Sequence, residues 1–317
     1  MSVELVVELK KAEGEDDDPT TLAGLLFLEA LMVKALLEAT ESAREEAVKS
    51  LLAVVSDLPT TKISFWQRQT LRKKIDRILT KLRIKLVRLS APVIHQMMSR
   101  IAKESAELTG AKHFAQLVTT SFRDASQIAN LSRSQMLFFS KHFDADISLK
   151  ARDIVVGVIK DNVKTPEKVR GILSTKLGKV IDQSESYFEV FTTNALNTAR
   201  SFANLRTFQK MGVTKFMIEA VIDSRTSDIC LDLDQKTFFV QTGINQMEKM
   251  ANATSVEDIQ NTSPWIHQGE DGYYIERNGS QVNFNENVSS SFLSGIGVTF
   301  PPYHARCRST VVPVEEL

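Results

Sequence analysis

The stretch TFQKMGVTKFMIEAVI, residues 207–222, marks the point at which the chain changes from helical to mixed structure. Upstream of it, residues 183–210 follow the period of one long helix, and Gly212 is a residue type that ends helices because it tolerates a left-handed backbone. Downstream, the β-branched and aromatic residues from Lys215 onward are typical of a strand. We therefore predict a helical N-terminal two-thirds followed by a small α+β C-terminal module.

A hairpin is the clearest local signal in this C-terminal module. Residues 273–276 and 281–284 have strand composition and flank Asn278-Gly279, the strongest short signal for a β-hairpin. Residues 236–240 (KTFFV) are aromatic and β-branched, so they predict another strand.

The remainder of the module has a weaker pattern. Residues 309–314 form a last predicted strand, and its Pro313 suits a sheet edge because proline cannot donate a ladder hydrogen bond. Between residues 241 and 299 the chain is rich in Asn, Ser and Gly. This composition predicts long, partly mobile loops.

The N-terminal part has helical periodicity. Apolar residues recur at helical spacing between Leu22 and Val55, and Pro59 closes this region because proline restricts the residue before it. A second helix is predicted over residues 62–88, where apolar side chains step by three or four residues.

Proline and glycine set the predicted helix boundaries further along. Pro92 starts another predicted helix, which runs from about residue 93 to residue 108 and is capped by Gly110. Residues 112–143 have helical periodicity without a breaker and predict one more helix.

These patterns divide the chain into three predicted parts. Residues 1–60 hold an acidic N-terminal segment and a helical region, residues 61–182 a helical region with the basic amphipathic helix 62–88, and residues 183–317 the C-terminal module. The predicted fold class is α+β, with short antiparallel strands and long loops in the C-terminal module.

Composition excludes several classes of protein. The 317 residues carry 39 Lys and Arg against 39 Asp and Glu, and 43% are hydrophobic, which is ordinary for a globular protein. No window approaches the roughly 18 apolar residues needed to span a bilayer, and the acids within MSVELVVELKK exclude a secretory signal peptide. Two cysteines cannot make a disulfide scaffold. We expect a soluble protein made in the cytoplasm.

Zero net charge hides two blocks of like charge. Residues 13–18 (EGEDDD) hold five acids, while residues 62–88 hold ten bases against one acid, a net charge of +9. Three interpretations of the basic helix are open: a solvated face, a surface that meets phosphates or an acidic partner, and a helix on a membrane surface. The candidate partner-facing or DNA-facing residues are Arg68, Arg72, Lys73, Lys74, Arg77, Lys81, Arg83, Lys85 and Arg88.

Two short stretches near the C-terminus carry metal-ligand residue types. The first, DSRTSDIC (residues 223–230), follows a predicted strand directly and ends in Cys230. The second, PPYHARCR (residues 301–308), places His304 and Cys307 on one turn. If the last strand pairs with the strand before residue 223, Cys230 comes close to this turn. Thiolate and imidazole together suit zinc.

Three such ligands leave a zinc site one ligand short. The candidate set is therefore Cys230, His304, Cys307 and Asp223, with Asp228, Asp232, His267 or water as alternatives for the fourth position. Two other interpretations of the cysteines are open, namely burial for packing alone and a disulfide that forms after release from the cell. Asp223 and Arg225 also have a structural interpretation, as a turn in which the aspartate bonds the backbone and the arginine pairs with an acid.

No familiar catalytic motif is present in the sequence, which lacks G-x-S-x-G, H-E-x-x-H, G-x-G-x-x-G and a P-loop. An enzyme is still an alternative, because clustered carboxylates hold divalent ions in metal-dependent nucleases and other hydrolases. The carboxylates in question are Asp223, Asp228, Asp232 and Asp234. No general base accompanies them in the sequence.

Taken in order, the C-terminal motifs resemble those of the phage head morphogenesis family, the Mu F-like minor head proteins. The resemblance covers about residues 185–314 and begins with a polar long helix that leads through Gly212 to a strand. It continues with Asp223-x-Arg225-Thr226-x-x-x-Cys230 and Leu233-Asp234-x-Lys236, and ends with Pro301-Pro302-x-His304-x-x-Cys307-Arg308. The residues that belong to the structural motif of the family are Asp223, Arg225, Thr226, Lys236, Pro301, Pro302 and Arg308.

The chain departs from this family at two places. Ala220 or Val221 stands where many members have an aromatic residue, and Ser309 stands where they have a further cysteine. The second departure removes a fourth sulfur ligand from the candidate zinc site.

The resemblance implies a non-enzymatic component of the virion of a tailed phage, present in few copies inside the head at or near the portal vertex. The role it implies is in head assembly, genome packaging or DNA delivery. The implied partners are the portal protein and the major capsid or scaffold protein, with packaged double-stranded DNA beside the basic helix and no membrane in the assembled head. The residues themselves leave two other functions open: a metal-dependent nuclease or toxin-like hydrolase, and a general DNA-binding protein.

Overall fold

The computed structural model describes residues 22–56, 65–115, 118, 121–142, 149–150, 153–154, 175–176, 184–270 and 272–314. The chain divides into two compact units. The first holds the described parts of residues 1–32, 93–138 and 189–317, and the second holds those of residues 33–92 and 139–188. The acidic run at residues 13–18 lies outside the described residues. The predicted domain boundaries after residues 60 and 182 stay a prediction.

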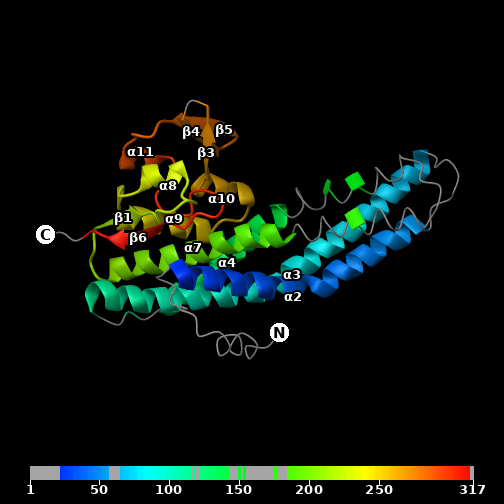
Figure 1. The fold of residues 1–317 in the computed structure, drawn as a ribbon, viewed down its shortest axis with the longest axis horizontal. Helices are drawn as coiled ribbons and strands as arrows, with labels where there is room; N and C mark the ends of the chain where they lie inside the picture. Colours follow the sequence, from blue (N-terminus) through cyan, green and yellow to red (C-terminus); the bar gives the residue numbers. More distant parts are fainter. Residues whose placement is uncertain are drawn as a thin grey trace. The chain divides into compact units, whose positions relative to one another are not determined.

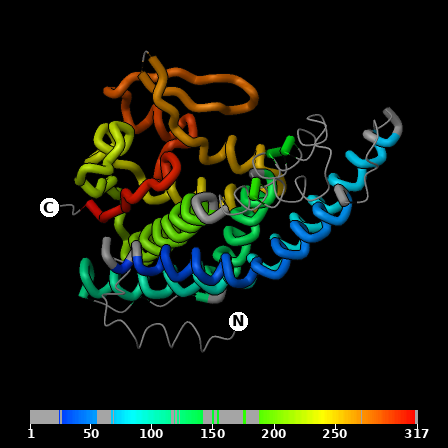
Figure 2. Tube along the Cα trace, turned by 45° about the vertical axis from the view of Figure 1, so that its right-hand side comes forward, coloured from blue at the N-terminus to red at the C-terminus, as the bar shows by residue number. Residues whose placement is uncertain are grey.

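Helices α2 (Leu22–Ser56) and α3 (Phe65–Phe114) confirm the predicted helical character of the N-terminal part. In the second unit, their segments lie side by side as an antiparallel pair (Figures 1 and 2). Leu36 and Leu51 of α2 and Ile75 and Leu86 of α3 are almost completely buried. The apolar stripe that the sequence places on the basic helix is therefore an interior surface.

The predicted helix boundary at Pro92 is wrong, because α3 continues through this residue to Phe114. A proline inside a helix loses a backbone hydrogen bond and costs about 3 kcal/mol. The buried stripe continues past the proline with Ile94, Met97 and Ile101. Because each buried aliphatic side chain contributes about 1.5–3 kcal/mol, this burial offsets the cost. The predicted helix cap at Gly110 is also wrong, because Gly110 lies inside α3.

The single helix predicted over residues 112–143 is interrupted. Helix α4 (Phe122–His142) starts after a break, and Ser121 precedes it. The Ser121 Oγ accepts a hydrogen bond from the Asp124 backbone N–H at 3.2 Å, and the Asp124 carboxylate accepts one from the Ser121 N–H at 2.9 Å. This reciprocal capping box satisfies two backbone donors. The Ser-x-x-Asp spacing is thus the sequence signal for this helix start.

Helix α7 (Ser184–Lys210) ends as predicted, and Gly212 follows with φ +76°. The strand after it, β1 (Lys215–Glu219), is the centre of a three-stranded sheet with the order β2-β1-β6. Both β2 (Thr237–Phe239) and β6 (Thr310–Pro313) pair with it antiparallel. The prediction that the last strand lies at an edge is confirmed.

A second sheet is formed by β3 (Ile266–Gly269), β4 (Gly272–Arg277) and β5 (Ser280–Phe284), in that order. The predicted hairpin joins β4 to β5. Asn278 and Gly279 have φ of +51° and +70°, which are the positive values that a two-residue hairpin turn of the favoured hand requires.

The prediction of long loops between residues 241 and 299 is wrong. This region contains α9 (Val240–Ala251), α10 (Val256–Thr262), β3 and α11 (Ser290–Gly295). The reason is visible in α9, where Val240, Ile244, Met247 and Met250 recur at helical spacing and are buried. The Asn and Gln residues between them conceal this period when composition alone is considered.

The fold class is α+β, as predicted. Helix α7 forms much of the interior of the first unit, since every residue from 191 to 205 is buried. It lies against β6, because the Asn204 side chain donates to the Val311 carbonyl at 3.3 Å (Figure 1). No helix among the described residues is both long and apolar enough to cross a membrane.

Candidate metal centre

Cys230 and the His304–Cys307 turn are brought together by the first sheet. Cys230 lies on the short helix α8 (Asp228–Leu233), whose cap Ser227 accepts a hydrogen bond from the Cys230 N–H at 3.2 Å. The turn precedes β6, and within it the Cys307 N–H donates to the His304 carbonyl at 3.3 Å. Because β6 pairs with β1, the segments before β6 and after β1 lie at the same end of the sheet. The pairing on which the predicted site depends is confirmed.

The three soft ligand atoms form one compact group. The Cys230 Sγ lies 3.0 Å from the His304 Nε2 and 3.8 Å from the Cys307 Sγ. All three atoms lie within 4.8 Å of one another, and both cysteines are free thiols buried in the protein. The group is therefore close enough to bind a metal ion.

The imidazole of His304 is oriented by hydrogen bonds on both nitrogens. Its Nδ1–H donates to the Ala305 carbonyl at 2.7 Å, so the Nε2 is the nitrogen that faces Cys230. The Ser227 Oγ lies 2.8 Å from the same Nε2. A carbonyl on the far nitrogen is the usual partner of a histidine that ligates metal, because it fixes the tautomer and the ring plane.

Hydrogen bonding and burial give the two sulfurs opposite proton affinities. The hydrogen bond from Cys307 lowers the pKa of Cys230 to about 4, against the effect of burial and with the help of His304. Burial, followed by the neighbouring Cys230 sulfur, raises the pKa of Cys307 well above its ordinary value. Burial lowers the pKa of His304, but the hydrogen bond with Cys230 outweighs it, so the net direction is upward. Without metal, Cys230 is thus the sulfur of the pair that more readily carries negative charge, and its neighbours His304 and Cys307 favour that charge.

Asp223, the predicted fourth ligand, is not part of this group and has another partner. Its two carboxylate oxygens accept hydrogen bonds from the two terminal nitrogens of Arg308 at 2.7 and 2.6 Å. It also accepts from the Arg225 backbone N–H at 2.8 Å. The hydrogen bond from Arg308 is the main cause that lowers the pKa of this carboxyl. Asp223 therefore ties its loop to the segment just before β6, the last strand.

The other predicted motif residues have structural partners. The Thr226 hydroxyl donates to the Val221 carbonyl at 2.6 Å and so closes the loop that contains Arg225. Lys236 donates to the Val288 carbonyl at 3.0 Å. Pro301 and Pro302 are joined by a cis peptide bond, and the Pro301 carbonyl accepts from the Ser201 hydroxyl at 3.3 Å.

The remaining acids of the predicted hydrolase site do not converge among the described residues. Asp228 accepts from Gln268 at 3.2 Å, Asp232 accepts from the Tyr273 hydroxyl, and Asp234 accepts from the Ala220 backbone N–H at 2.8 Å. His267, the other candidate ligand, stacks on Tyr274 with ring centroids 5.0 Å apart. Within the described residues, the close group of potential ligands consists of Cys230, His304 and Cys307.

Helix α7 contributes residues to the site that sequence reasoning did not identify. The Asn197 side-chain amide donates to the carbonyls of Cys307 and Ser309 at 2.9 and 3.1 Å, and Asn197 is completely buried. A buried amide that bonds two carbonyls of a turn fixes that turn relative to the helix. The signal in the sequence is the run of Thr, Asn, Ser and Arg at positions that a buried helix would normally fill with apolar side chains.

The predicted partner-facing cations lie on α3. Arg72, Lys73, Lys74, Arg77, Lys81, Lys85 and Arg88 are exposed, and Arg83 is half-buried. Lys85 pairs with Glu46 of α2, and this hydrogen bond, with a contribution from Lys81, lowers the pKa of Glu46. The side chain of Arg68 lies outside the described residues.

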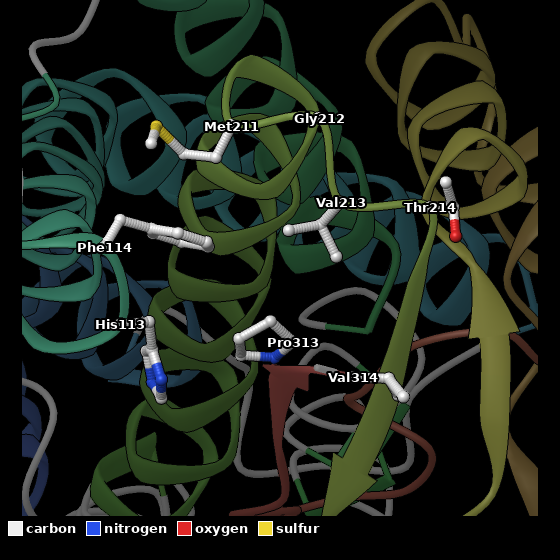
Figure 3. Close-up of a pocket in the computed structure, with 8 residues that line it drawn as sticks. All are labelled: His113, Phe114, Met211, Gly212, Val213, Thr214, Pro313 and Val314. Atoms are coloured by element: carbon white, nitrogen blue, oxygen red, sulfur yellow. The ribbon is translucent and has the colours of Figure 1, made fainter. Parts of the chain in front are cut away.

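A small cavity of about 210 Å³ lies in the first unit at the end of α7 (Figure 3). His113 and Phe114 from the end of α3 face Pro313 of β6 across it, and the turn around Gly212 lines its far side. It is separate from the cysteine–histidine group and is lined mainly by apolar atoms.

Comparison with known proteins adds nothing to these observations: no protein-family model, curated protein or solved structure matches this chain.

Proposed function

We propose that this chain is a minor head protein of a tailed phage, a non-enzymatic virion component that binds the portal protein at or near the portal vertex inside the head. There it assists head assembly, genome packaging or DNA delivery. The proposal starts from the resemblance of residues 185–314 to the Mu F-like minor head proteins.

The observation that carries it is the way the separated motifs of that resemblance meet in one unit. Asp223 is held by Arg308 through two short hydrogen bonds. Cys230 meets His304 and Cys307, and α7 bonds the same turn through Asn197. Motifs that hold one another in place are what a structural module requires, and this arrangement supports the resemblance.

A structural role fits better than the hydrolase alternative because the acids of the module are engaged. Asp223 is neutralised by Arg308, and Asp234 accepts a backbone hydrogen bond in the β1 region. A site that binds catalytic divalent ions needs carboxylate oxygens that point at one common position.

We further propose that Cys230, His304 and Cys307 hold zinc. Two thiolates and an imidazole match its preference, and the observed Sγ–Sγ separation of 3.8 Å equals the edge of a tetrahedron with Zn–S bonds of about 2.3 Å. The fourth position is left to water or to the neighbouring Ser227 hydroxyl, since Asp223 pairs with Arg308. Zinc bound there would tie α8 to the turn before β6 and so stabilise the module.

The head role is tested by mass spectrometry of purified virions and by co-purification with the portal protein. We expect the chain in the virion in substoichiometric amount relative to the major capsid protein, and in a complex with the portal protein. Virions that lack the chain contradict the proposal.

The zinc proposal is tested by elemental analysis of the purified full-length chain. We expect about one equivalent of zinc, released together with a lower melting temperature when a chelator is added. Cys307→Ser should lose the metal, while Asp223→Asn should keep it because Asp223 is not a ligand. Less than about 0.2 equivalents, with both thiols titrating, leaves no zinc site.

A further inference from the structure

We propose that the solvent-facing side of α3 binds the phosphate backbone of duplex DNA without regard to sequence. The surface is a stripe of five exposed cations, here called the basic stripe, and it goes beyond the head role without depending on it. Its members are Lys73, Lys74, Arg77, Lys81 and Arg88.

The five side chains share one face of α3. At roughly 100° per residue they fall within roughly 100° of the helix circumference, opposite the side that buries Leu71, Ile75 and Leu82. From Lys73 to Arg88 the stripe is about 22 Å long at about 1.5 Å per residue. Duplex DNA carries about 13 phosphates over the same length of its axis, so the cations of the stripe can lie along a row of opposite charges.

The stripe contains no acid, and its cations face solvent. None of the five forms an ion pair with another described residue, whereas Lys85, at the border of the stripe, pairs with Glu46 of α2. The acid of this segment, Asp76, is half-buried and lies outside the stripe, about 60° around the helix from Lys73. Like charges held this close repel one another, and a polyanion relieves that repulsion.

The composition of the stripe favours duplex DNA over a protein or a single strand. Protein interfaces have an apolar or aromatic centre and few lysines, but the one large apolar side chain that is exposed between Lys73 and Arg88 is Ile84, 58% exposed. Binding of single strands uses aromatic stacking, and no aromatic residue lies on α3 between Lys73 and Arg88.

The packing of α3 argues against a lipid surface as the partner. A helix that lies on a membrane must offer its apolar face to the lipid. The apolar face of this segment is already buried within the second unit, where Leu71, Ile75, Leu79, Leu82 and Leu86 are at most 5% exposed. Only the charged face is available.

The test is fluorescence anisotropy of the full-length chain with a labelled 30-base-pair duplex of mixed sequence, over a range of salt. With about five phosphate contacts, log K should fall with log salt at a slope of about −4.5, which weakens binding roughly 500-fold between about 50 and 200 mM salt. A flat dependence overturns the proposal. So does tighter binding to poly-glutamate, or to vesicles with anionic lipid, than to the duplex under the same conditions.

Two variants with equal charge change locate the surface. One replaces all five stripe cations by glutamine. The magnitude of the salt slope should then decrease nearly to zero, because each lost contact removes about one unit. The control replaces five exposed lysines elsewhere, and its affinity should stay within about threefold of the native value. The control lysines are Lys103, Lys112, Lys176, Lys215 and Lys249.

Glutamine is a good helix former, so both variants should keep the native helical circular dichroism. Single substitutions provide a second series that does not depend on the fivefold variant, and each should lower the slope by about one. Equal losses in the stripe variant and the control variant show a general effect of net charge and overturn the proposal.

Discussion

Charged side chains behave in opposite ways in the first unit and on the basic stripe of α3. In the first unit, Asp124 accepts from Arg206 and Lys210 at 2.8 and 2.7 Å, and Asp223 accepts from Arg308. On the basic stripe, five cations point to solvent. Charges of the first kind are satisfied within the fold, whereas charges of the second kind repel one another and gain most from an outside partner. Position along the chain does not reveal this difference, because both sets are ordinary helix or loop residues.

The largest expected effect is at Asp124, whose side chain is 2% exposed and joins α4 to α7. Asp124→Ala leaves Arg206, whose side chain is 12% exposed, without its carboxylate partner, and we expect a loss of about 3 kcal/mol in the free energy of unfolding by urea. The neighbouring Arg123→Gln breaks a pair with Glu248 in which the arginine is 71% exposed, and should cost less than about 1 kcal/mol. Equal losses would show that burial does not separate the two kinds of pair.

The contribution of the Asp124 carboxyl to stability depends on pH, and its sign follows from the shift of its pKa. Burial raises the pKa of Asp124, but hydrogen bonds from Lys210, Ser121 and Arg206 outweigh it, so the net direction is downward. Its contribution to stability is therefore complete above the unfolded value of 3.8 and is lost as the pH falls below that value. The native chain should show this acid loss, and Asp124→Ala should show less of it.

Glu29 is the exception within the first unit. Its substitution should raise the free energy of unfolding, by an amount smaller than the loss at Asp124. Burial raises the pKa of Glu29 from 4.5 to about 7, although Thr193 and Arg308 lower it. The folded chain thus holds a proton that the unfolded chain releases, and stability falls as the pH rises from about 4.5 to about 7. Glu29→Gln should stabilise the chain by about 1–3 kcal/mol at pH 8 and leave it unchanged at pH 4.

Urea unfolding at the two pH values measures this difference. Glu38→Gln is the matched control, because Glu38 is an exposed carboxylate on the same helix and should change neither value. If both variants gain equally at pH 8, net charge and not the burial of Glu29 is responsible.

The smallest expected effect separates Lys85 from its neighbours on α3. Because Lys85 pairs with Glu46 and both are exposed, Lys85→Gln should leave the urea midpoint unchanged. It should also lower duplex affinity less than Lys81→Gln, which removes a member of the basic stripe. Glu46→Gln releases Lys85 and should steepen the salt slope by up to one unit. A larger loss with Lys85→Gln than with Lys81→Gln would place the phosphate-binding face elsewhere on α3.

The sequence by itself determined the features that depend on neighbouring residues. The α+β class, the end of α7 at Gly212 and the hairpin at Asn278-Gly279 follow from helical period, strand composition and turn chemistry. The edge position of β6 follows from Pro313, because proline lacks the hydrogen-bond donor of an inner strand. The sulfur–imidazole group was also anticipated from residue types, on the condition that β6 pairs with β1.

Only the tertiary structure decided which residues far apart in the chain share one place. Cys230 and Cys307 meet across 77 residues through the register of β1 and β6, and the same packing gives Asp223 to Arg308 instead of to the cysteine–histidine group. The continuity of α3 through Pro92 and the helices between residues 241 and 299 are likewise products of burial. The physical reason is that turns and helix periods are set within a few residues, whereas burial, and with it the choice of partner for a charge or a thiol, exists only once distant segments pack together.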